Sequence, residues 1–305
     1  MAIERILIPT DFSETAQLAA IHGLYMAHLF KGKAFLFHAV ESNIYAYTGE
    51  PLPMGEPAGS YAAEPETAYG QIEEKLHRVA DEMTKKYDVE VITDIVIKTN
   101  SPAKEIAAAV KDNKIDIIVM GTHGAGGFEE LFMGSNAHKV VNLAPCPVIS
   151  VQKFAKKPGF STIIMPIDND LHSRQKVNNV IELATVYKST VHILGLLETD
   201  DATDDKKFEI KLDSVEHSLK QANIPFVRKL VRGHNLAIEA MKYSEEVGGD
   251  LIAIMTGHES NYTGMFLGPS AKQIVNHSKI PVLSIKPEET TIETFDPIGG
   301  TGVII

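Results

Sequence analysis

Near the N-terminus lies the segment Ile6-Leu7-Ile8-Pro9-Thr10-Asp11, and its pattern returns 157 residues later as Ile163-Ile164-Met165-Pro166-Ile167-Asp168. In both copies a short apolar run passes through a proline to an aspartate, as is typical of a buried strand that runs into a turn. The period is far longer than the units of solenoid proteins. The chain is therefore predicted to contain two copies of one domain.

The two copies also match near their ends, at a smaller offset. Asp116-Ile117-Ile118 matches Asp250-Leu251-Ile252, and Pro147-Val148 matches Pro281-Val282, in both cases 134 residues apart. The first copy therefore holds 23 additional residues. We place them at 43–65, a stretch rich in Gly, Pro and Tyr without periodicity, which predicts a loop. A lid over a ligand, a contact surface and a plain insertion remain open as its roles.

The composition excludes several classes of protein. The chain has 305 residues, 44% of them hydrophobic, and a formal charge of −11, which leaves no basic field for nucleic acid. It has neither an apolar run long enough for a membrane helix nor the pattern of a signal peptide, so we expect a cytoplasmic protein without a membrane partner. The one cysteine, Cys146, excludes an internal disulfide and offers no partner for a thiolate metal site.

Short strand-like runs alternate with longer helical patterns within each copy. Ser13 is a predicted N-cap for a helix that reaches about Phe30, and Pro102 is predicted to start another. Strands joined by crossover helices indicate a parallel sheet covered on both faces, and thus a doubly wound α/β domain. The strands expected in the first copy are 5–8, 34–40, 90–97, 115–120 and 148–151.

The predicted domain boundaries follow from this pattern. The first domain spans 1–152 and carries the candidate ligand loop, and the second spans 160–287. A linker with Pro158 and Gly159 separates them. The tail at 288–305 is rich in Gly and Thr.

A glycine-rich segment follows the fourth strand of the first copy. It reads Gly121-Thr122-His123-Gly124-Ala125-Gly126-Gly127, and Gly134-Ser135 then opens a helix. Glycines allow backbone N–H groups to approach a ligand, and a helix N-terminus favours phosphate. A phosphate cradle is one interpretation, and a flexible surface loop is the other. Neither a Walker A loop nor a complete dinucleotide fingerprint is present.

Gly121, Gly124, Gly134 and Ser135 fit the pattern G-x2-G-x9-G-[S/T], which resembles the ATP-binding motif of universal stress proteins. Two further segments resemble that family, Pro9-Thr10-Asp11-Phe12-Ser13 and Ala144-Pro145-Cys146-Pro147-Val148. The resemblance covers almost the whole chain as a tandem pair. It implies two five-stranded parallel sheets of strand order 3-2-1-4-5, of the adenine nucleotide alpha-hydrolase-like type.

The resemblance also implies a nucleotide site in the first half. Adenine lies against the end of the first strand and the backbone after the second, with Asp11 beside adenine and ribose, and the phosphates meet the glycine loop and the following helix. For Asp11 a turn or cap role is the alternative, and for Ser135 a simple helix start. The residues expected to bind the nucleotide are Pro9, Thr10, Asp11, Ala39, Val40, Met120, Gly121, Gly124, Gly134, Ser135 and Asn136.

Two departures from the family pattern bear on this site. No Lys or Arg occurs from Gly121 to Ala137, so we expect ATP to bind together with Mg²⁺, which supplies the missing positive charge. In the second copy Met255 replaces Gly121, and Pro269 replaces Ser135, which removes a backbone donor. His258 stands at the position of Gly124. The second half is therefore predicted not to bind ATP as the first does.

The leading hypothesis is an ATP-binding regulatory or sensory module of the stress response, with slow or no hydrolysis and no catalytic residue of its own. A metal-assisted ATPase that uses Asp11 is one alternative. The other is a nucleotide-free interaction module. The segments Val148–Val151 and Val282–Ile285 are expected to pair between the two halves or between chains as a homodimer, because unpaired strand edges must be covered.

Overall fold

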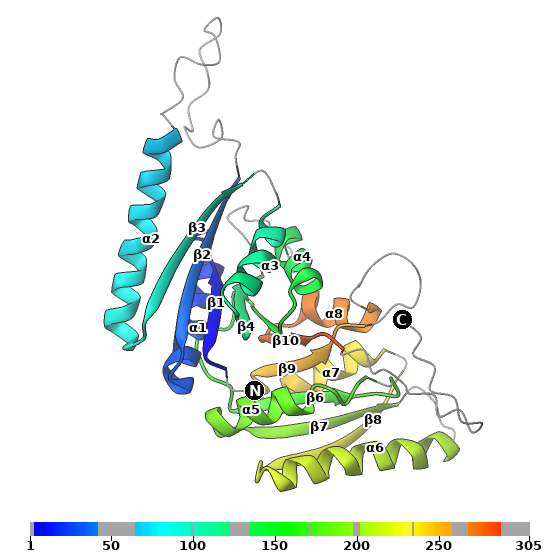
Figure 1. The fold of residues 1–305 in the computed structure, drawn as a ribbon. Helices are drawn as coiled ribbons and strands as arrows, with labels where there is room; N and C mark the ends of the chain where they lie inside the picture. Colours follow the sequence, from blue (N-terminus) through cyan, green and yellow to red (C-terminus); the bar gives the residue numbers. More distant parts are fainter. Residues whose placement is uncertain are drawn as a thin grey trace, which may run out of the picture.

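A computed structural model describes residues 3–41, 65–98, 101–122, 134–170, 172–197, 202–233, 235–257 and 268–287. Within these ranges strands and helices alternate through both halves of the chain (Figure 1). The elements of the first half are β1 (Arg5–Pro9), α1 (Glu14–Phe30), β2 (Lys33–Glu41), α2 (Pro65–Tyr87), β3 (Val91–Lys98), α3 (Pro102–Asp112), β4 (Ile117–Gly121), α4 (Ser135–Leu143) and β5 (Val148–Val151). The loop expected at 43–65 lies almost wholly outside the described residues.

The second half repeats this order. Its elements are β6 (Thr162–Ile167), α5 (Val177–Tyr187), β7 (Thr190–Leu197), α6 (Ala202–Gln221), β8 (Phe226–Arg232), α7 (Leu236–Glu246), β9 (Leu251–Met255), α8 (Pro269–His277) and β10 (Val282–Ile285). The alternation of strand and helix predicted from the sequence is confirmed in both halves.

The strands of both halves join in a single sheet of order β3-β2-β1-β4-β5-β10-β9-β6-β7-β8. Each half therefore has the order 3-2-1-4-5 that the resemblance implied, with parallel pairing inside the half. The halves meet at β5 and β10, which pair antiparallel with Leu283 opposite Ile149. The hydroxyl of Ser150 also donates to the carbonyl oxygen of Val282 at 3.3 Å. The two last strands thus cover each other's edges within one chain.

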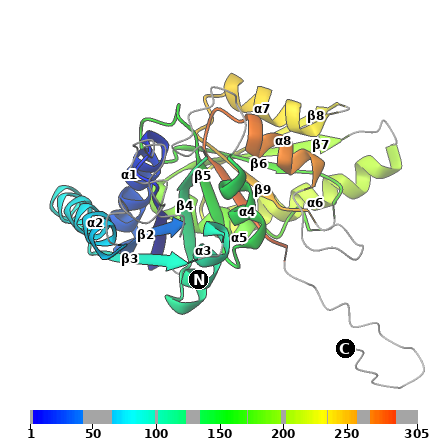
Figure 2. The same ribbon diagram turned by 90° about the horizontal axis from the view of Figure 1, so that it is seen from above.

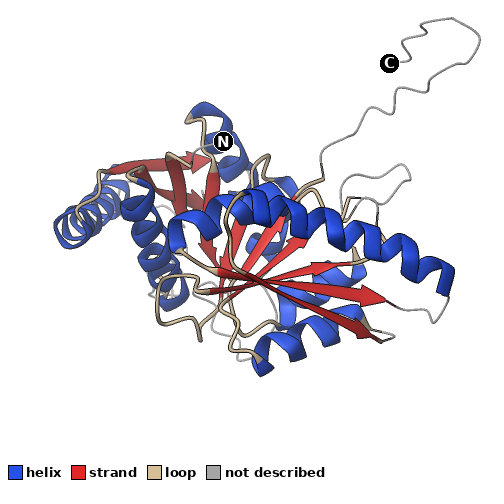
Figure 3. Ribbon diagram, turned by 90° about the horizontal axis from the view of Figure 1, so that it is seen from below, coloured by secondary structure: helices blue, strands red, loops and turns tan. Residues whose placement is uncertain are grey.

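Helices cover both faces of this sheet. On one face α1, α2, α5 and α6 pack over a core cluster that includes Ile8, Leu36, Met165 and Phe208. On the other face α3, α4, α7 and α8 pack over a second cluster that includes Phe35 and Ile252. Figure 2 shows the sheet between these two layers, and Figure 3 shows α6, lowest in Figure 1, in front of the fanned strands. Within the described residues no helix is long and apolar enough to cross a membrane.

An aromatic cluster joins the helices α1 and α5 across the boundary between the halves. The ring of Tyr187 on α5 lies 5.0 Å from that of Phe160 and 6.1 Å from that of Tyr25 on α1. The ring of His22, which is 3% exposed, stacks on Phe160, and its Nε2 lies 2.9 Å from the carbonyl oxygen of Ala155. His22 thus has a packing role at the boundary between the halves.

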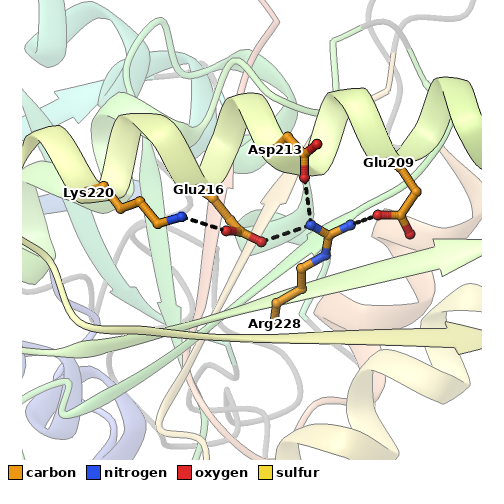
Figure 4. Close-up of polar contacts among 5 residues, drawn as sticks. All are labelled: Glu209, Asp213, Glu216, Lys220 and Arg228. Atoms are coloured by element: carbon orange, nitrogen blue, oxygen red, sulfur yellow. Dashed lines mark hydrogen bonds and ion pairs between the residues drawn. The ribbon is translucent and has the colours of Figure 1, made fainter.

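The edge strand β8 is fastened to α6 by one arginine. Arg228 forms ion pairs with Asp213 and Glu216 at 2.8 Å and with Glu209, all on successive turns of α6 (Figure 4). Lys220 pairs with the same Glu216 at 3.0 Å. α6 also buries Phe208, Leu212, Val215 and Leu219 in the core, so these apolar side chains attach the helix to the sheet and the ion pairs add a polar contact beside them.

Candidate functional site

The candidate site of the first half lies where the strand order reverses. β1 and β4 are neighbours in the sheet, and their ladder pairs Ile6 with Ile117 and Leu7 with Ile118. The chain leaves β1 toward α1 on one face and leaves β4 toward α4 on the other. Ligands of open α/β sheets bind in such crevices beyond the carboxyl ends of the strands. The expected residues Pro9, Thr10, Met120 and Gly121 all lie at this edge.

The backbone of Thr10 is held by hydrogen bonds to residues of β2. Its N–H donates to the carbonyl oxygen of Phe37 at 2.8 Å, and its own carbonyl oxygen accepts from Nδ1 of His38 at 2.6 Å. β2 then continues beyond β1, since its ladder with β3 runs on to Glu41 whereas its ladder with β1 ends at Pro9. The backbone at Ala39 and Val40, expected to meet adenine, belongs to this overhanging part of β2.

His38 is a feature of the site that sequence reasoning missed. The side chain is 5% exposed, its ring lies 4.8 Å from that of Phe12, and its Nε2 has no hydrogen-bond partner among the described residues. Because Nδ1 donates to Thr10, Nε2 is left as an acceptor. A polar residue inside the otherwise apolar run 34–40 was the signal that could have indicated it.

Asp11 is exposed at the start of the turn between β1 and α1. Its carboxylate accepts the backbone N–H of Ser13 at 3.0 Å, and Phe12 between them has a φ of 63°. Ser13 is the N-cap of α1 and accepts from Ala16, as the sequence predicted. Asp11 therefore has the turn role that was its alternative interpretation, in a position that faces the carboxyl edge of the sheet.

The ends of β4 and α4 are joined by short backbone hydrogen bonds. Gly134 N–H donates to the carbonyl oxygen of Thr122 at 2.7 Å, and Thr122 N–H donates to Val151 at 3.1 Å. A Cβ on Gly121 would lie 2.8 Å from the carbonyl carbon of Thr15 on α1, so only glycine allows this approach. The glycine motif thus has a packing function in addition to any role toward a ligand.

The N-terminus of α4 is open to an anion. Gly134 is its N-cap without a side-chain hydrogen bond, and no acidic residue lies in its first turn. Ser135 and Asn136 are both exposed there. Uncapped N–H groups and the positive end of the helix dipole form an anion site. Gly124 and His123 lie outside the described residues.

The second half has a partly open cavity at the equivalent edge. It has a volume of about 230 Å³ and lies between the end of β6, the loop before α5, the end of β9 and the start of α8. Met255 and Pro269, which replace Gly121 and Ser135, both line it. Pro269 is the first residue of α8 and has no N–H to offer.

This cavity exists because α5 is shorter than α1. The two helices end at equivalent residues, Phe30 and Tyr187, but α1 begins at Glu14 whereas α5 begins only at Val177. The missing turns are replaced by a loop in which Asp168 accepts the N–H of Asp170 at 3.1 Å. In the first half the start of α1 packs directly against the end of β4, where a Cβ on Gly121 would lie 2.8 Å from the carbonyl carbon of Thr15.

Lys176, the N-cap of α5, is buried in the wall of the cavity with 2% exposure. Its ammonium group donates to the carbonyl oxygen of Ser173 at 2.6 Å. Burial lowers the pKa of Lys176 to about 8, although the charges of Asp168 and Asp170 oppose this shift. The sequence analysis did not single out this lysine.

Neither metal binding nor thiol chemistry is supported elsewhere in the described ranges. They contain no group of three His, Cys, Asp or Glu side chains arranged to hold a metal ion. Burial raises the pKa of the Cys146 thiol to about 12, which keeps it protonated and unreactive. Cys146 packs against the second core cluster.

The fold places this chain among tandem doubly wound α/β proteins. The model of the universal stress protein family matches it twice, at residues 2–152 and 159–286. The chain therefore belongs to the universal stress protein family.

Individual relatives agree with this assignment. Universal stress protein MJ0531 of Methanocaldococcus jannaschii is 32% identical over 154 residues, 50% of this chain and 85% of that protein. A universal stress protein of Thermus aquaticus is 32% identical over 153 residues, 48% of this chain and 97% of that protein. The solved structure of a universal stress protein from Archaeoglobus fulgidus superposes with a TM-score of 0.68 at 16% identity and covers 94% of this chain and 99% of that one, which supports the fold.

Proposed function

We propose that the first half binds ATP with Mg²⁺ and that the protein acts as a regulatory module of the stress response, in which nucleotide occupancy changes its shape or its partners. The observation that carries this proposal is the uncapped N-terminus of α4 beside the end of β4, held there by the Gly134 to Thr122 hydrogen bond. It provides phosphate-binding donors without a competing side chain. The family motif formed by Gly121, Gly124, Gly134 and Ser135 supplies the identity of the ligand.

The remaining residues are proposed to meet the nucleoside part. Pro9, Thr10 and Asp11 lie at the end of β1 and Met120 lies near the end of β4, and we assign adenine to the overhanging backbone at Ala39 and Val40. Ser135 and Asn136 offer their N–H groups, and Ser135 also its hydroxyl, to the phosphates. Asp11 accepts the backbone N–H of Ser13, which is a turn role, and we propose slow or no hydrolysis.

Nucleotide content is the first test of this proposal. The freshly purified chain is denatured and its released adenine nucleotides are quantified, and the emptied protein is then titrated with ATP and Mg²⁺ by calorimetry. About one nucleotide per chain is expected, since one of the two halves has the complete motif. No released nucleotide together with no binding heat would contradict ATP binding and favour the nucleotide-free interaction module.

Exchange of one residue between the halves locates the site. Ser135→Pro gives the first half the residue of the second, and it removes a backbone donor and a hydroxyl while proline remains acceptable at the first position of a helix. We expect binding to weaken by about tenfold or more. Pro269→Ser is the matched control in the second half and is expected to leave ATP affinity unchanged. Equal effects of the two variants would place the nucleotide elsewhere.

We propose that the protein is cytoplasmic. We also propose that it does not form a homodimer through β5 and β10. β5 and β10 already pair with each other inside the chain, so a dimer built on those edges would require this pairing to open.

A further inference from the structure

The cavity of the second half contains a charged group that the first half lacks. Position 176 corresponds to Ala19, since the repeats are 157 residues apart in this region, and Ala19 is a fully buried residue of the core. In the second half α5 starts at Val177, the residue directly after position 176, and the equivalent of Ala19 is Lys176. A long cationic side chain therefore extends from a buried position at which the first half has only a methyl group.

This ammonium group has little compensation within the protein. The hydrogen bonds that it donates to described residues both end on Ser173, at the carbonyl oxygen (2.6 Å) and at the hydroxyl (3.4 Å). No carboxylate of the described residues forms an ion pair with it, and Asp168 and Asp170 act on it only through space. A buried cation without an ion-pair partner is unfavourable, and an anion that enters the cavity would remove that penalty.

The distribution of charge in the cavity is uneven. Asp168 is half-buried and Asp170 is exposed, whereas Lys176 is buried. The carboxylates are held by backbone donors, Asp168 by the N–H of Asp170 and Asp170 by the N–H of His172 at 2.7 Å. The interior is therefore positive and the rim is negative. A doubly charged phosphate is disfavoured by the two carboxylates, while a singly charged group that reaches the interior is favoured.

The remaining lining of the cavity is largely apolar. Leu196, Ile254 and Ile274 line it and are each less than 5% exposed, and Leu236 borders it from the start of α7. A volume of about 230 Å³ admits a compact organic molecule. Apolar walls with one interior charge are typical of sites for small organic acids.

We propose that the cavity of the second half binds a small carboxylic acid with an apolar body, whose carboxylate pairs with the ammonium of Lys176. The site is separate from the ATP site proposed for the first half, and it does not depend on that proposal. It gives the second half a ligand of its own in place of the nucleotide for which its motif is incomplete.

Matched probes test the charge requirement. The full chain is titrated by calorimetry with 3-methylbutanoate and benzoate, and with the alcohol and amine of the same carbon skeletons. We expect the carboxylates to bind at least about tenfold more tightly than their alcohols, because the alcohol replaces an ion pair with the ammonium by a hydrogen bond from the ammonium to a neutral oxygen. Binding of the amines in preference, binding of ATP at this cavity, or no carboxylate binding tighter than about 10 mM would overturn the proposal.

Two variants connect binding to the named residues. Lys176→Met keeps an unbranched side chain, shorter by one heavy atom, and removes the charge, and it should weaken carboxylate binding by about tenfold or more while leaving the alcohols nearly unaffected. Asp168→Asn lowers the negative charge at the rim and should tighten carboxylate binding about twofold to fivefold. The second variant does not alter a buried side chain, so it keeps the test decisive if Lys176→Met fails to fold. Unchanged carboxylate affinity in Asp168→Asn, or in folded Lys176→Met, would contradict the assignment.

Discussion

Asp116 and Asp250 occupy equivalent positions in the two halves, and each carboxylate accepts the backbone N–H groups at the entry to the first strand of its own half. Asp116 binds the N–H groups of Glu4 and Arg5 at 2.8 and 2.9 Å. Asp250 binds those of Ser161 and Thr162 at 2.8 and 2.9 Å, and also the hydroxyl of Ser161 at 2.6 Å. Asp116 directly precedes β4, the neighbour of β1, and Asp250 directly precedes β9, the neighbour of β6. Each carboxylate therefore links the starts of two neighbouring strands and sets their register.

Removal of either carboxylate should weaken its half. Asp250→Ala removes the acceptor of three hydrogen bonds and is expected to lower the free energy of unfolding by about 2 kcal/mol or more. Asp116→Ala removes the acceptor of two, so we expect a slightly smaller decrease in the free energy of unfolding. Urea unfolding followed by circular dichroism measures this. Asp112→Ala, at an exposed position on α3, is the control and should change stability little. A loss no greater than that of the control would refute the structural role of the pair.

Gly121 is predicted to be needed for the fold as well as for the site. In Gly121→Ala the new Cβ would lie 2.8 to 3.0 Å from backbone atoms of Thr15 and Ala16, which cannot move aside as a side chain can. We expect a loss of about 2 kcal/mol in the free energy of unfolding.

Gly70→Ala provides the opposite control, because a Cβ at Gly70 meets nothing within 4 Å and the residue lies inside α2. That variant should be more stable by about 0.5 to 1 kcal/mol. Thermal unfolding of Gly121→Ala and Gly70→Ala measures both effects. Wild-type stability of Gly121→Ala would contradict the prediction, because it would show that α1 can move away from β4.

Arg228 should make the attachment of α6 sensitive to salt and acid. Arg228→Met is expected to cost about 1 kcal/mol, because Asp213 and Glu209 are largely exposed and the ion pairs are screened. The hydrogen bond from Arg228 lowers the pKa of Glu216. A lowered carboxylate pKa stabilises the fold above the pKa of the unfolded chain, and this contribution disappears as the pH falls through the folded value.

The variant should therefore lose less stability than wild type between about pH 5 and pH 3. Unfolding midpoints at both pH values measure the difference. Lys33→Met, which breaks the exposed pair with Glu90, is the control and should show a smaller effect at neutral pH. Parallel acid curves for wild type and Arg228→Met would exclude the linkage.

His22 should make the contact between the halves sensitive to pH. Burial lowers the pKa of His22, so the folded protein favours the neutral ring. Its stabilising contribution is complete above the unfolded value of about 6.5 and decreases as the pH falls from there toward the folded pKa. Stability should therefore drop between about pH 7.5 and pH 5.

His22→Gln should reduce that drop, whereas His28→Gln, at an exposed position on the same helix, should leave it unchanged. Chemical unfolding at the two pH values provides the comparison. If both variants retain the wild-type pH dependence, His22 is not its source.

Several elements were predictable because their signals are local. The N-cap at Ser13 requires only a hydroxyl and a nearby N–H, and the alternation of apolar runs with helical patterns indicated a doubly wound fold. His38 was missed because its importance depends on Thr10, a residue on the neighbouring strand that sequence spacing does not relate to it.

The sequence by itself determined the duplication, the alternation of strands and helices and the loss of the phosphate motif in the second half, because repeats, apolar periodicity and single replacements such as Pro269 are local properties of the chain. The strand order within each half followed from the family resemblance. Only the tertiary structure decided that β5 and β10 pair within one chain, since strand edges choose partners by availability in space. It also decided that Lys176 lines a cavity. The start of α5 depends on the packing of the loop before it, and helix boundaries set by tertiary contacts cannot be deduced from propensity alone.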